Sequence, residues 1–262
     1  GPNINIASCF EGIEGKSVII YSGDININSI DDGINSAKKN KKEITEQANL
    51  IKNIENNFNE NSDSKPVISI YGGKIKIIYN ETGLDSNGDI NIFGGDISLI
   101  QGVKGDNSIE HSGIIKLSQT SLISIGKDQT EKLNEIIKSN QKYANYNGII
   151  AKNKILKIKN SDKLIIKEII IEEDINYIFY TSPELNENFA FFICDTNGED
   201  EVKYNFNLGQ LEEEKNEPEK KEDEDDDDNF VLVFLLSFFG AIILLIIIFF
   251  IFRTIRRNCS KK

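Results

Sequence analysis

Acidic and amide side chains recur at corresponding places in the first half of the chain. The set is Glu11, Glu14, Asp31, Asp32, Asn35, Glu81, Asp85 and Asp106. Carboxylates held close together repel one another unless a cation lies between them. Ca²⁺ accepts about six to eight oxygens from carboxylates, amides and backbone carbonyls. The pattern predicts Ca²⁺ as a cofactor, although Asp, Asn and Gly are also common turn residues without any metal.

Three aromatic residues share one position beside a glycine. They are Tyr21, Tyr71 and Phe93, and we expect them to stack on the outside of the molecule. Flat rings on a surface can pack against the apolar faces of sugar rings. Aromatic ladders also stabilise β-structure without a ligand, so both interpretations of this column stand.

An internal repeat positions both sets. The stretches "VIIYSGDININSIDDGINS", "ISIYGGKIKIIYNETGLDS" and "INIFGGDISLIQGVKGDNS" align, and the last two begin 22 residues apart, at Ile68 and Ile90. A partial copy precedes them and a weaker one, 114–126, follows. Apolar residues alternate with polar ones within each copy, which indicates strands with one buried face.

The repeat predicts an all-β fold, a parallel β-helix over 1–126 with an insertion at 38–65. We expect ladders of isoleucine inside it. An antiparallel sandwich is the alternative, but it gives no reason for copies with the same offsets. Stacking predicts one column of Glu14, Asn35, Asp85 and Asn107, another of Glu11, Asp32, Thr82 and Lys104, and Asp31 above Glu81.

The pattern changes after Gly126. We expect residues 127–211 to form a small module, with a helix over "QTEKLNEIIKSNQKYA" followed by several strands and a turn at Ser182-Pro183-Glu184. Residues 212–229 form an acidic linker. Cys9 and Cys194 either pair or remain separate thiols.

Residues 230–252 are apolar and uncharged, and their length matches the roughly 20 residues that cross a bilayer as a helix. Arginines and lysines follow them and acidic residues precede them. The positive-inside rule therefore places the tail, 253–262, in the cytoplasm and the N-terminal domain outside a single-pass membrane protein. The net charge of -12 disfavours nucleic acid as a partner. The sequon at Asn80 predicts a glycosylation site in a eukaryote.

The motifs "DDGINS", Tyr/Phe-Gly-Gly, "GLDSNGDINIFGG" and "DNSIEHSG" resemble a calcium-dependent carbohydrate-binding domain family. Its members are right-handed parallel β-helices of cellulose- and pectin-degrading bacteria and anaerobic fungi, and the resemblance covers about residues 3–126. It implies acidic turns at Asp31, Asp32 and Asn35, at Asp85, and at Asp106. Glu81-Thr82-Gly83 and Val103-Lys104-Gly105 depart from the usual Gly-Asp-Gly, and Lys104 puts a third calcium site in doubt.

The sequence therefore predicts a membrane-anchored extracellular protein, not an enzyme, that binds a cellulose- or pectin-like polysaccharide. Because the chain is acidic, a neutral glucan is at least as good a ligand as pectin unless Ca²⁺ bridges the carboxylates. A polysaccharide lyase is one alternative. Lyases of this fold commonly use an arginine, however, and all three arginines lie in the tail; Lys74, Lys76, Lys104 and His111 remain as bases. A structural or adhesive surface protein is the other alternative.

Overall fold

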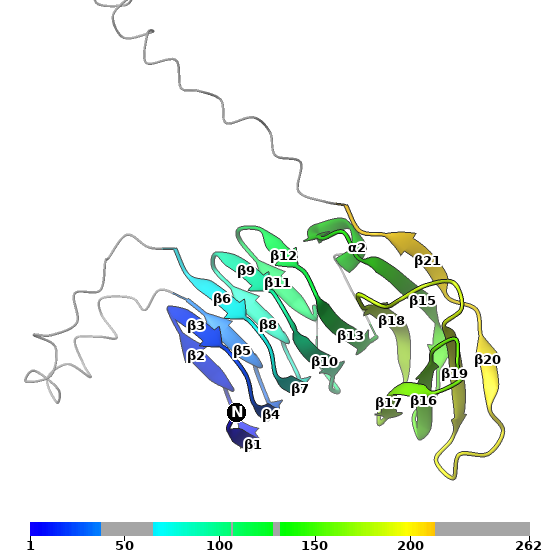
Figure 1. Cartoon of the computed structure of the whole chain (residues 1–262). Coiled ribbons are helices and arrows are strands. Elements are labelled where there is room, and N and C mark those ends of the chain that lie inside the picture. Colours follow the sequence, from blue (N-terminus) through cyan, green and yellow to red (C-terminus); the bar gives the residue numbers. More distant parts are fainter. Residues whose placement is uncertain (38–64, 106, 128–131, 213–262) are drawn as a thin grey trace, which may run out of the picture. The chain divides into compact units, whose positions relative to one another are not determined.

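The computed structural model describes residues 1–37, 65–105, 107–127 and 132–212. The described part of the chain is all-β, with 58% of its residues in strands, and contains a parallel β-solenoid of about four turns (Figure 1). These findings confirm the predicted all-β class and the parallel stacking of the repeats.

Each solenoid turn passes through three parallel sheets in the order C, A, B. Sheet C contains β3 (Ser17–Ile20), β6 (Val67–Ile70), β9 (Asp89–Ile92), β12 (Ile115–Leu117) and β14 (Ile137–Lys138). The parallel part of sheet A contains β1 (Asn3–Cys9), β4 (Asp24–Ser29), β7 (Lys74–Tyr79), β10 (Gly95–Gln101) and β13 (Thr120–Gly126). Sheet B contains β2 (Ile13–Gly15), β5 (Ile34–Ser36), β8 (Leu84–Ser86) and β11 (Ile109–His111).

Isoleucine ladders fill the solenoid, as the period-two pattern predicts. In sheet A, Ile27 pairs with Ile77, which pairs with Leu99, and all three side chains are at most 3% exposed. In sheet C, Ile20, Ile70 and Ile92 form an equivalent buried row. Apolar side chains pack on one another from turn to turn, because each turn repeats the same inward positions.

Glycines with positive φ make the bends from sheet C to sheet A. Gly23, Gly73 and Gly95 have φ of 139°, 107° and 106°, which a residue with a Cβ rarely adopts. In the fourth turn the bend carries Gln119 at φ 49° instead. The glycine two residues after each aromatic of the repeat therefore makes the bend between two strands in three turns.

The insertion lies outside the described residues from 38 to 64, and the solenoid register continues across it. Strand β5 ends at Ser36, β6 begins at Val67, and Val67 N donates to Lys16 O at 3.1 Å. The sequence between them therefore adds no rung to the stack.

Residues after Gly126 are mostly strand. The predicted helix is limited to one turn, α2 (Leu133–Ile136), in the part that the structure describes. Ile137 instead pairs with Ile115 in sheet C, and residues from Lys142 enter β15 (Lys142–Ile150). The buried isoleucine ladder thus overrides the local helical preference. The predicted turn at Ser182-Pro183-Glu184 is confirmed, since it follows β18 (Ile175–Thr181).

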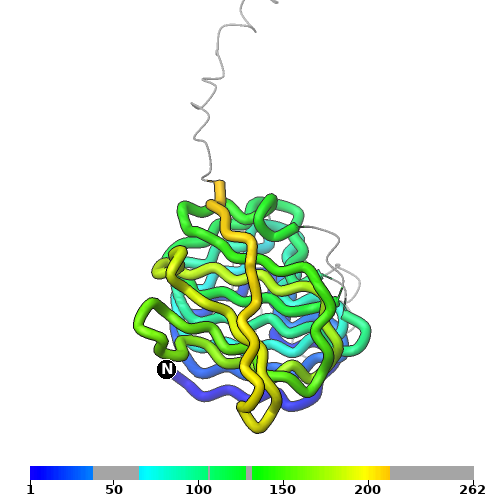
Figure 2. The backbone as a smooth tube through the Cα atoms, turned by 90° about the vertical axis from the view of Figure 1, so that its right-hand side faces the viewer, coloured from blue at the N-terminus to red at the C-terminus, as the bar shows by residue number. Residues whose placement is uncertain are grey.

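The C-terminal strands extend sheet A and add a second layer. Strands β18, β15 and β21 (Asn207–Gln210) continue sheet A beyond β13 with antiparallel pairing. A separate antiparallel sheet D contains β17 (Ile165–Ile171), β16 (Lys154–Lys159), β19 (Ala190–Asp195) and β20 (Val202–Tyr204). In Figure 2 the green and yellow C-terminal strands lie in front of the blue N-terminal turns.

Two apolar cores result. One fills the solenoid, and the other joins residues of sheet A such as Ile123 and Ile178 to residues of sheet D such as Leu156 and Phe191. Residues 127–211 are thus continuous with the solenoid. Cys9 and Cys194 are both free, in β1 and β19.

No helix among the described residues has the length and apolar character to span a membrane. The predicted membrane segment 230–252, the tail 253–262 and nearly all of the acidic linker lie outside those residues.

Candidate functional site

The outer face of sheet B carries a column of oxygen-bearing side chains, which we call the acidic ladder. It consists of Glu14, Asn35, Asp85 and Glu110, which pair residue by residue through β2, β5, β8 and β11. The first three members are as predicted. The fourth is Glu110 and not Asn107, so the predicted column was wrong at its last position.

Three additional residues in the third turn cause this difference. In the second turn the chain passes from sheet A to sheet B over five positions, from Tyr79 to Leu84. In the third turn the same connection takes eight positions, from Gln101 to Ile109. Ser108 consequently takes the place that an alignment on the bend glycines would give to Gly105. Leu84 N donates to Ser108 O just as Ile34 N donates to Gly83 O.

The neighbouring column contains Glu11, Asp32 and Thr82, and Asn107 occupies its fourth position in place of Lys104. Asn107 lies one residue before Ser108, as Thr82 does before Gly83, and its amide donates to Glu110 Oε1 at 3.2 Å. Lys104 is exposed among the additional residues and does not interrupt the column. Asp106 lies outside the described residues.

Asp32 is the most perturbed carboxyl group of this surface. Its side chain is only 8% exposed, and its Oδ1 accepts a hydrogen bond from Thr82 N at 3.2 Å. Burial, followed by repulsion from Asp85, Glu11 and Asp31, raises its pKa to about 7. Burial is also the largest cause that raises the pKa of Glu11 and of Asp85, and neighbouring carboxylates add to it. The carboxyl groups are thus close enough to repel one another.

Asp31 lies beside Glu81 on the next turn, as predicted. The neighbouring Asp31 side chain, as a hydrogen-bonding partner and as a charge, is the largest cause that raises the pKa of Glu81. Two carboxyl groups can share a hydrogen bond only when one of them is protonated, and a cation between two carboxylates would offset their repulsion without that proton.

Two buried oxygens in the first turns of this surface lack a hydrogen-bond donor. They are Glu11 Oε2 and Asn35 Oδ1. A buried acceptor without a donor is costly, and an all-oxygen set of this kind suits a hard cation such as Ca²⁺. The carbonyls of Gly33 and Gly83 already accept ladder hydrogen bonds, so side chains are the main source of oxygens here. Within the described ranges, no three His, Cys, Asp or Glu side chains converge on one point as a metal site.

The three predicted aromatic residues form one column at the bend between sheets C and A. Tyr21 and Tyr71 stack with ring centroids 5.2 Å apart, and Tyr71 and Phe93 stack at 5.1 Å. Their exposed fractions are 71%, 48% and 42%. The offset in the sequence therefore predicted the aromatic column correctly. Because each ring partly covers the next, the column presents mainly ring edges to solvent, and ring faces are open only at its ends.

Asn80, the predicted glycosylation site, connects three turns at the opposite corner of sheet A. Its Nδ2 donates to Ser29 O at 3.0 Å, and its Oδ1 accepts from Val103 N at 3.1 Å. Thr82, the third residue of the sequon, is 2% exposed. Glycosylation there remains a prediction, and a glycan on this amide would compete with the contact to Ser29.

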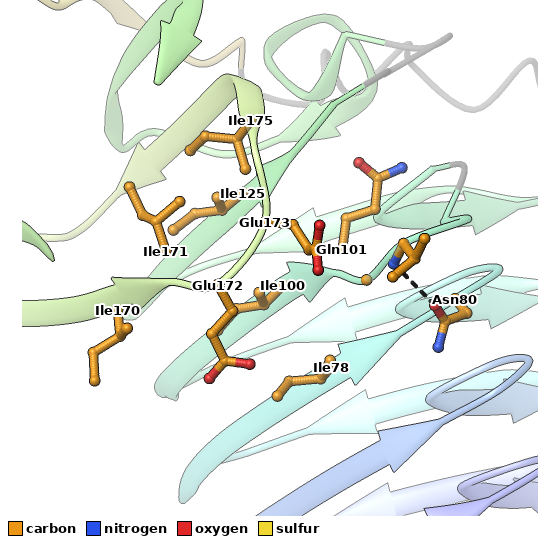
Figure 3. A pocket seen from close by; sticks show the side chains of 12 residues that line it. Ile78, Asn80, Ile100, Gln101, Ile125, Ile170, Ile171, Glu172, Glu173 and Ile175 are labelled. Atoms are coloured by element: carbon orange, nitrogen blue, oxygen red, sulfur yellow. Dashed lines mark hydrogen bonds between the residues drawn. The ribbon is translucent and has the colours of Figure 1, made fainter. Parts of the chain in front are cut away.

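A separate hollow of about 170 Å³ lies where the outer face of sheet A meets the turn between β17 and β18 (Figure 3). Isoleucines from both sides line it, together with the polar residues Asn80, Gln101 and Glu173. None of its lining residues belongs to the aromatic column or to the acidic ladder.

The sequence matches no family model, and neither a curated protein nor a solved structure shows significant similarity to the chain. The resemblance carried by "DDGINS" and the glycine-rich repeats therefore remains a prediction.

Proposed function

We propose that the solenoid is a carbohydrate-binding module that Ca²⁺ stabilises and that residues 230–252 anchor in a cell membrane with the N-terminal domain outside. The observation that supports it most is the aromatic column. Tyr21, Tyr71 and Phe93 retain 42–71% exposure, whereas the rings and isoleucines of the solenoid core are almost completely buried. The ring edges along the column and the open ring faces at its ends give a polysaccharide such as cellulose or pectin an aromatic surface to contact.

The acidic ladder supports the calcium part of the proposal. In this ladder and the neighbouring column, carboxylates lie on adjacent turns and raise one another's pKa, and two buried oxygens, Glu11 Oε2 and Asn35 Oδ1, lack donors. Ca²⁺ bound between turns would neutralise this charge and hold the turns together. The aromatic column lies at the bend between sheets C and A, whereas the acidic ladder lies on sheet B. In this proposal the cation has a structural role and the rings contact the sugar.

A pull-down of the full chain with insoluble polysaccharides tests the proposal. The protein is held in a detergent without a sugar headgroup and mixed with cellulose or with a pectin gel, in Ca²⁺ or in EDTA. We expect retention on at least one polysaccharide in Ca²⁺, and retention should weaken in EDTA only as far as the fold weakens. If the folded protein stays in solution with every polysaccharide, the solenoid is not a carbohydrate-binding module.

A further inference from the structure

The aromatic column ends at Phe93, although the solenoid continues. Phe93 N donates to Ile70 O at 2.7 Å, and Ser118 N donates to Ile92 O at 2.8 Å. Leu117 also pairs with Ile92 in sheet C. Ser118 is therefore the equivalent of Phe93 one turn later. A small hydroxyl side chain stands where the column would place its fourth ring.

A hollow of about 270 Å³ occupies this place. Phe93 forms one wall, Lys116 and Lys138 lie at its side, and Ser118, Ser139 and Asn140 complete its polar lining. Pockets for drug-sized ligands begin at about 300 Å³. The hollow is thus suited to a single ring of monosaccharide size, next to the face of Phe93 that Tyr71 does not cover.

The two lysines give the hollow a charge opposite to that of the whole chain. Lys116 pairs directly with Lys138 on adjacent strands, and Lys138 Nζ lies 3.5 Å from the carbonyl oxygen of Glu135. The equivalent positions on the two preceding turns are Asn91 and Ser69, which are uncharged. Lys138 in turn pairs with Glu212 through an isolated bridge. Like charges directly opposite each other repel, and an anion between the two ammonium groups lowers that repulsion. The positive charges appear at the same turns at which the ring is missing.

We infer that this hollow binds one acidic pyranose, a uronic acid or a sulfated sugar residue, as the fourth ring of the aromatic column. The apolar face of the sugar stacks on Phe93, and its carboxylate or sulfate lies between the ammonium groups of Lys116 and Lys138. Ser118 and Asn140 provide polar groups for the sugar hydroxyls. The inference rests on the proposed carbohydrate binding and specifies the class of sugar.

Two variants separate the parts of this site. Ser118→Phe fills the hollow and extends the column by one ring, so it should block the sugar without loss of thermal stability. Lys116→Gln/Lys138→Gln leaves the hollow open and removes only its charge. The matched control is Lys76→Gln/Lys152→Gln, which removes the same charge from two exposed positions elsewhere.

Binding is measured by isothermal titration calorimetry on the full chain in the same sugar-free detergent. The probes are a galacturonic acid trimer, a neutral glucose trimer and benzoate. EDTA is present throughout, so that Ca²⁺ cannot bridge the uronate to the acidic ladder. We expect the parent to bind the galacturonate trimer at least tenfold more tightly than the glucose trimer. Ser118→Phe and the Lys116/Lys138 variant should each lose at least tenfold, whereas the control should bind like the parent.

Equal affinity for the two trimers, or uronate binding that ignores both variants, overturns the inference and leaves the proposed carbohydrate binding intact. Benzoate binding as tight as that of the uronate trimer also overturns it, because the site would then recognise an aromatic anion. If neither trimer binds and the pull-down is also negative, the proposed function fails together with the inference.

Discussion

Replacement of Asp32 by Asn should stabilise the metal-free protein at neutral pH. The side chain of Asp32 is nearly buried, and three other carboxylates, those of Asp85, Glu11 and Asp31, act on it. Asn has nearly the same shape and keeps an oxygen that can accept the hydrogen bond from Thr82 N. The substitution therefore removes the charge and retains the contact.

The magnitude follows from the pKa. Burial and the neighbouring carboxylates raise the pKa of Asp32 from 3.8 to about 7, which corresponds to about 4 kcal/mol at about 1.4 kcal/mol per pKa unit. The neighbouring carboxyl groups titrate with Asp32 and water screens part of the repulsion, so about 2 kcal/mol is the expected effect. Because the folded-state pKa is the higher one, protonation stabilises the fold fully below about pH 4. This stabilisation is lost as the pH rises through about 7.

Urea unfolding between pH 4 and pH 8 in EDTA, followed by circular dichroism, measures the effect. The Asp32→Asn variant should match the parent at pH 4 and exceed its free energy of unfolding by about 2 kcal/mol at pH 8. The control Asp162→Asn, at an exposed turn residue, should stay within about 0.5 kcal/mol of the parent at both pH values. An Asp32→Asn variant that is less stable than the parent at pH 8 would refute the reasoning. It would mean that the charged carboxylate gains more from its contacts than it loses by burial and repulsion.

Three further predictions concern the acidic ladder, the aromatic column and the bends. Addition of Ca²⁺ at a hundredfold excess over its dissociation constant should stabilise the parent by about 2.7 kcal/mol, and an unchanged melting temperature would count against a calcium site. Tyr71→Ala removes two stacking contacts and should lower the free energy of unfolding by about 1–3 kcal/mol. This cost is smaller than the about 2–5 kcal/mol expected for Ile77→Ala in the core. If polysaccharide retention falls only as far as stability falls, the ring is purely structural. Gly73→Ala should destabilise the protein by about 1–3 kcal/mol, because φ is 107° and the new Cβ would lie 2.8 Å from Gly23 O. The matched variant is Gly72→Ala, which should cost less. Its φ is not positive, and the nearest atom to its new Cβ would lie at 3.1 Å.

The repeats made the solenoid predictable because one physical requirement recurs on every turn. An inward position must be apolar, a bend with positive φ favours glycine, and the next turn repeats both. Ile25, Ile75 and Ile97 show this in sheet A, where they lie in one buried row. An alignment of the sequence with itself therefore predicts which residues meet in space.

The same alignment failed where the turns differ in length. The copies were aligned at the glycine of the bend, and the alignment was extended without a gap as far as Asn107. The third turn, however, has three additional residues after Gln101. The apolar start of each short strand is the better guide, because Ile109 must occupy the inward position of Leu84. Alignment of "IEH" with "LDS" would have placed Glu110 in the acidic ladder.

The helix predicted after Gly126 failed for a different reason. Local sequence favours a helix over "EKLNEIIKSN". Ile137, however, pairs with Ile115 and so extends the buried ladder at the end of sheet C. The burial of Ile137 at 0% exposure outweighs the small preference of its neighbours for helix. Such an outcome depends on the end of the solenoid, which is not visible in the local sequence.

The hollow beside Phe93 lies at a position where one copy of the repeat differs from the others. Alignment draws attention to residues that agree between copies, and Ser118 disagrees with Tyr21, Tyr71 and Phe93. In a stack of equivalent turns, however, a small residue where its predecessors are large leaves a space whose wall is the last large residue. The change from uncharged residues to Lys116 and Lys138 falls at the same turns. The positions at which a solenoid breaks its own repeat are therefore the ones at which a ligand can replace the missing side chain.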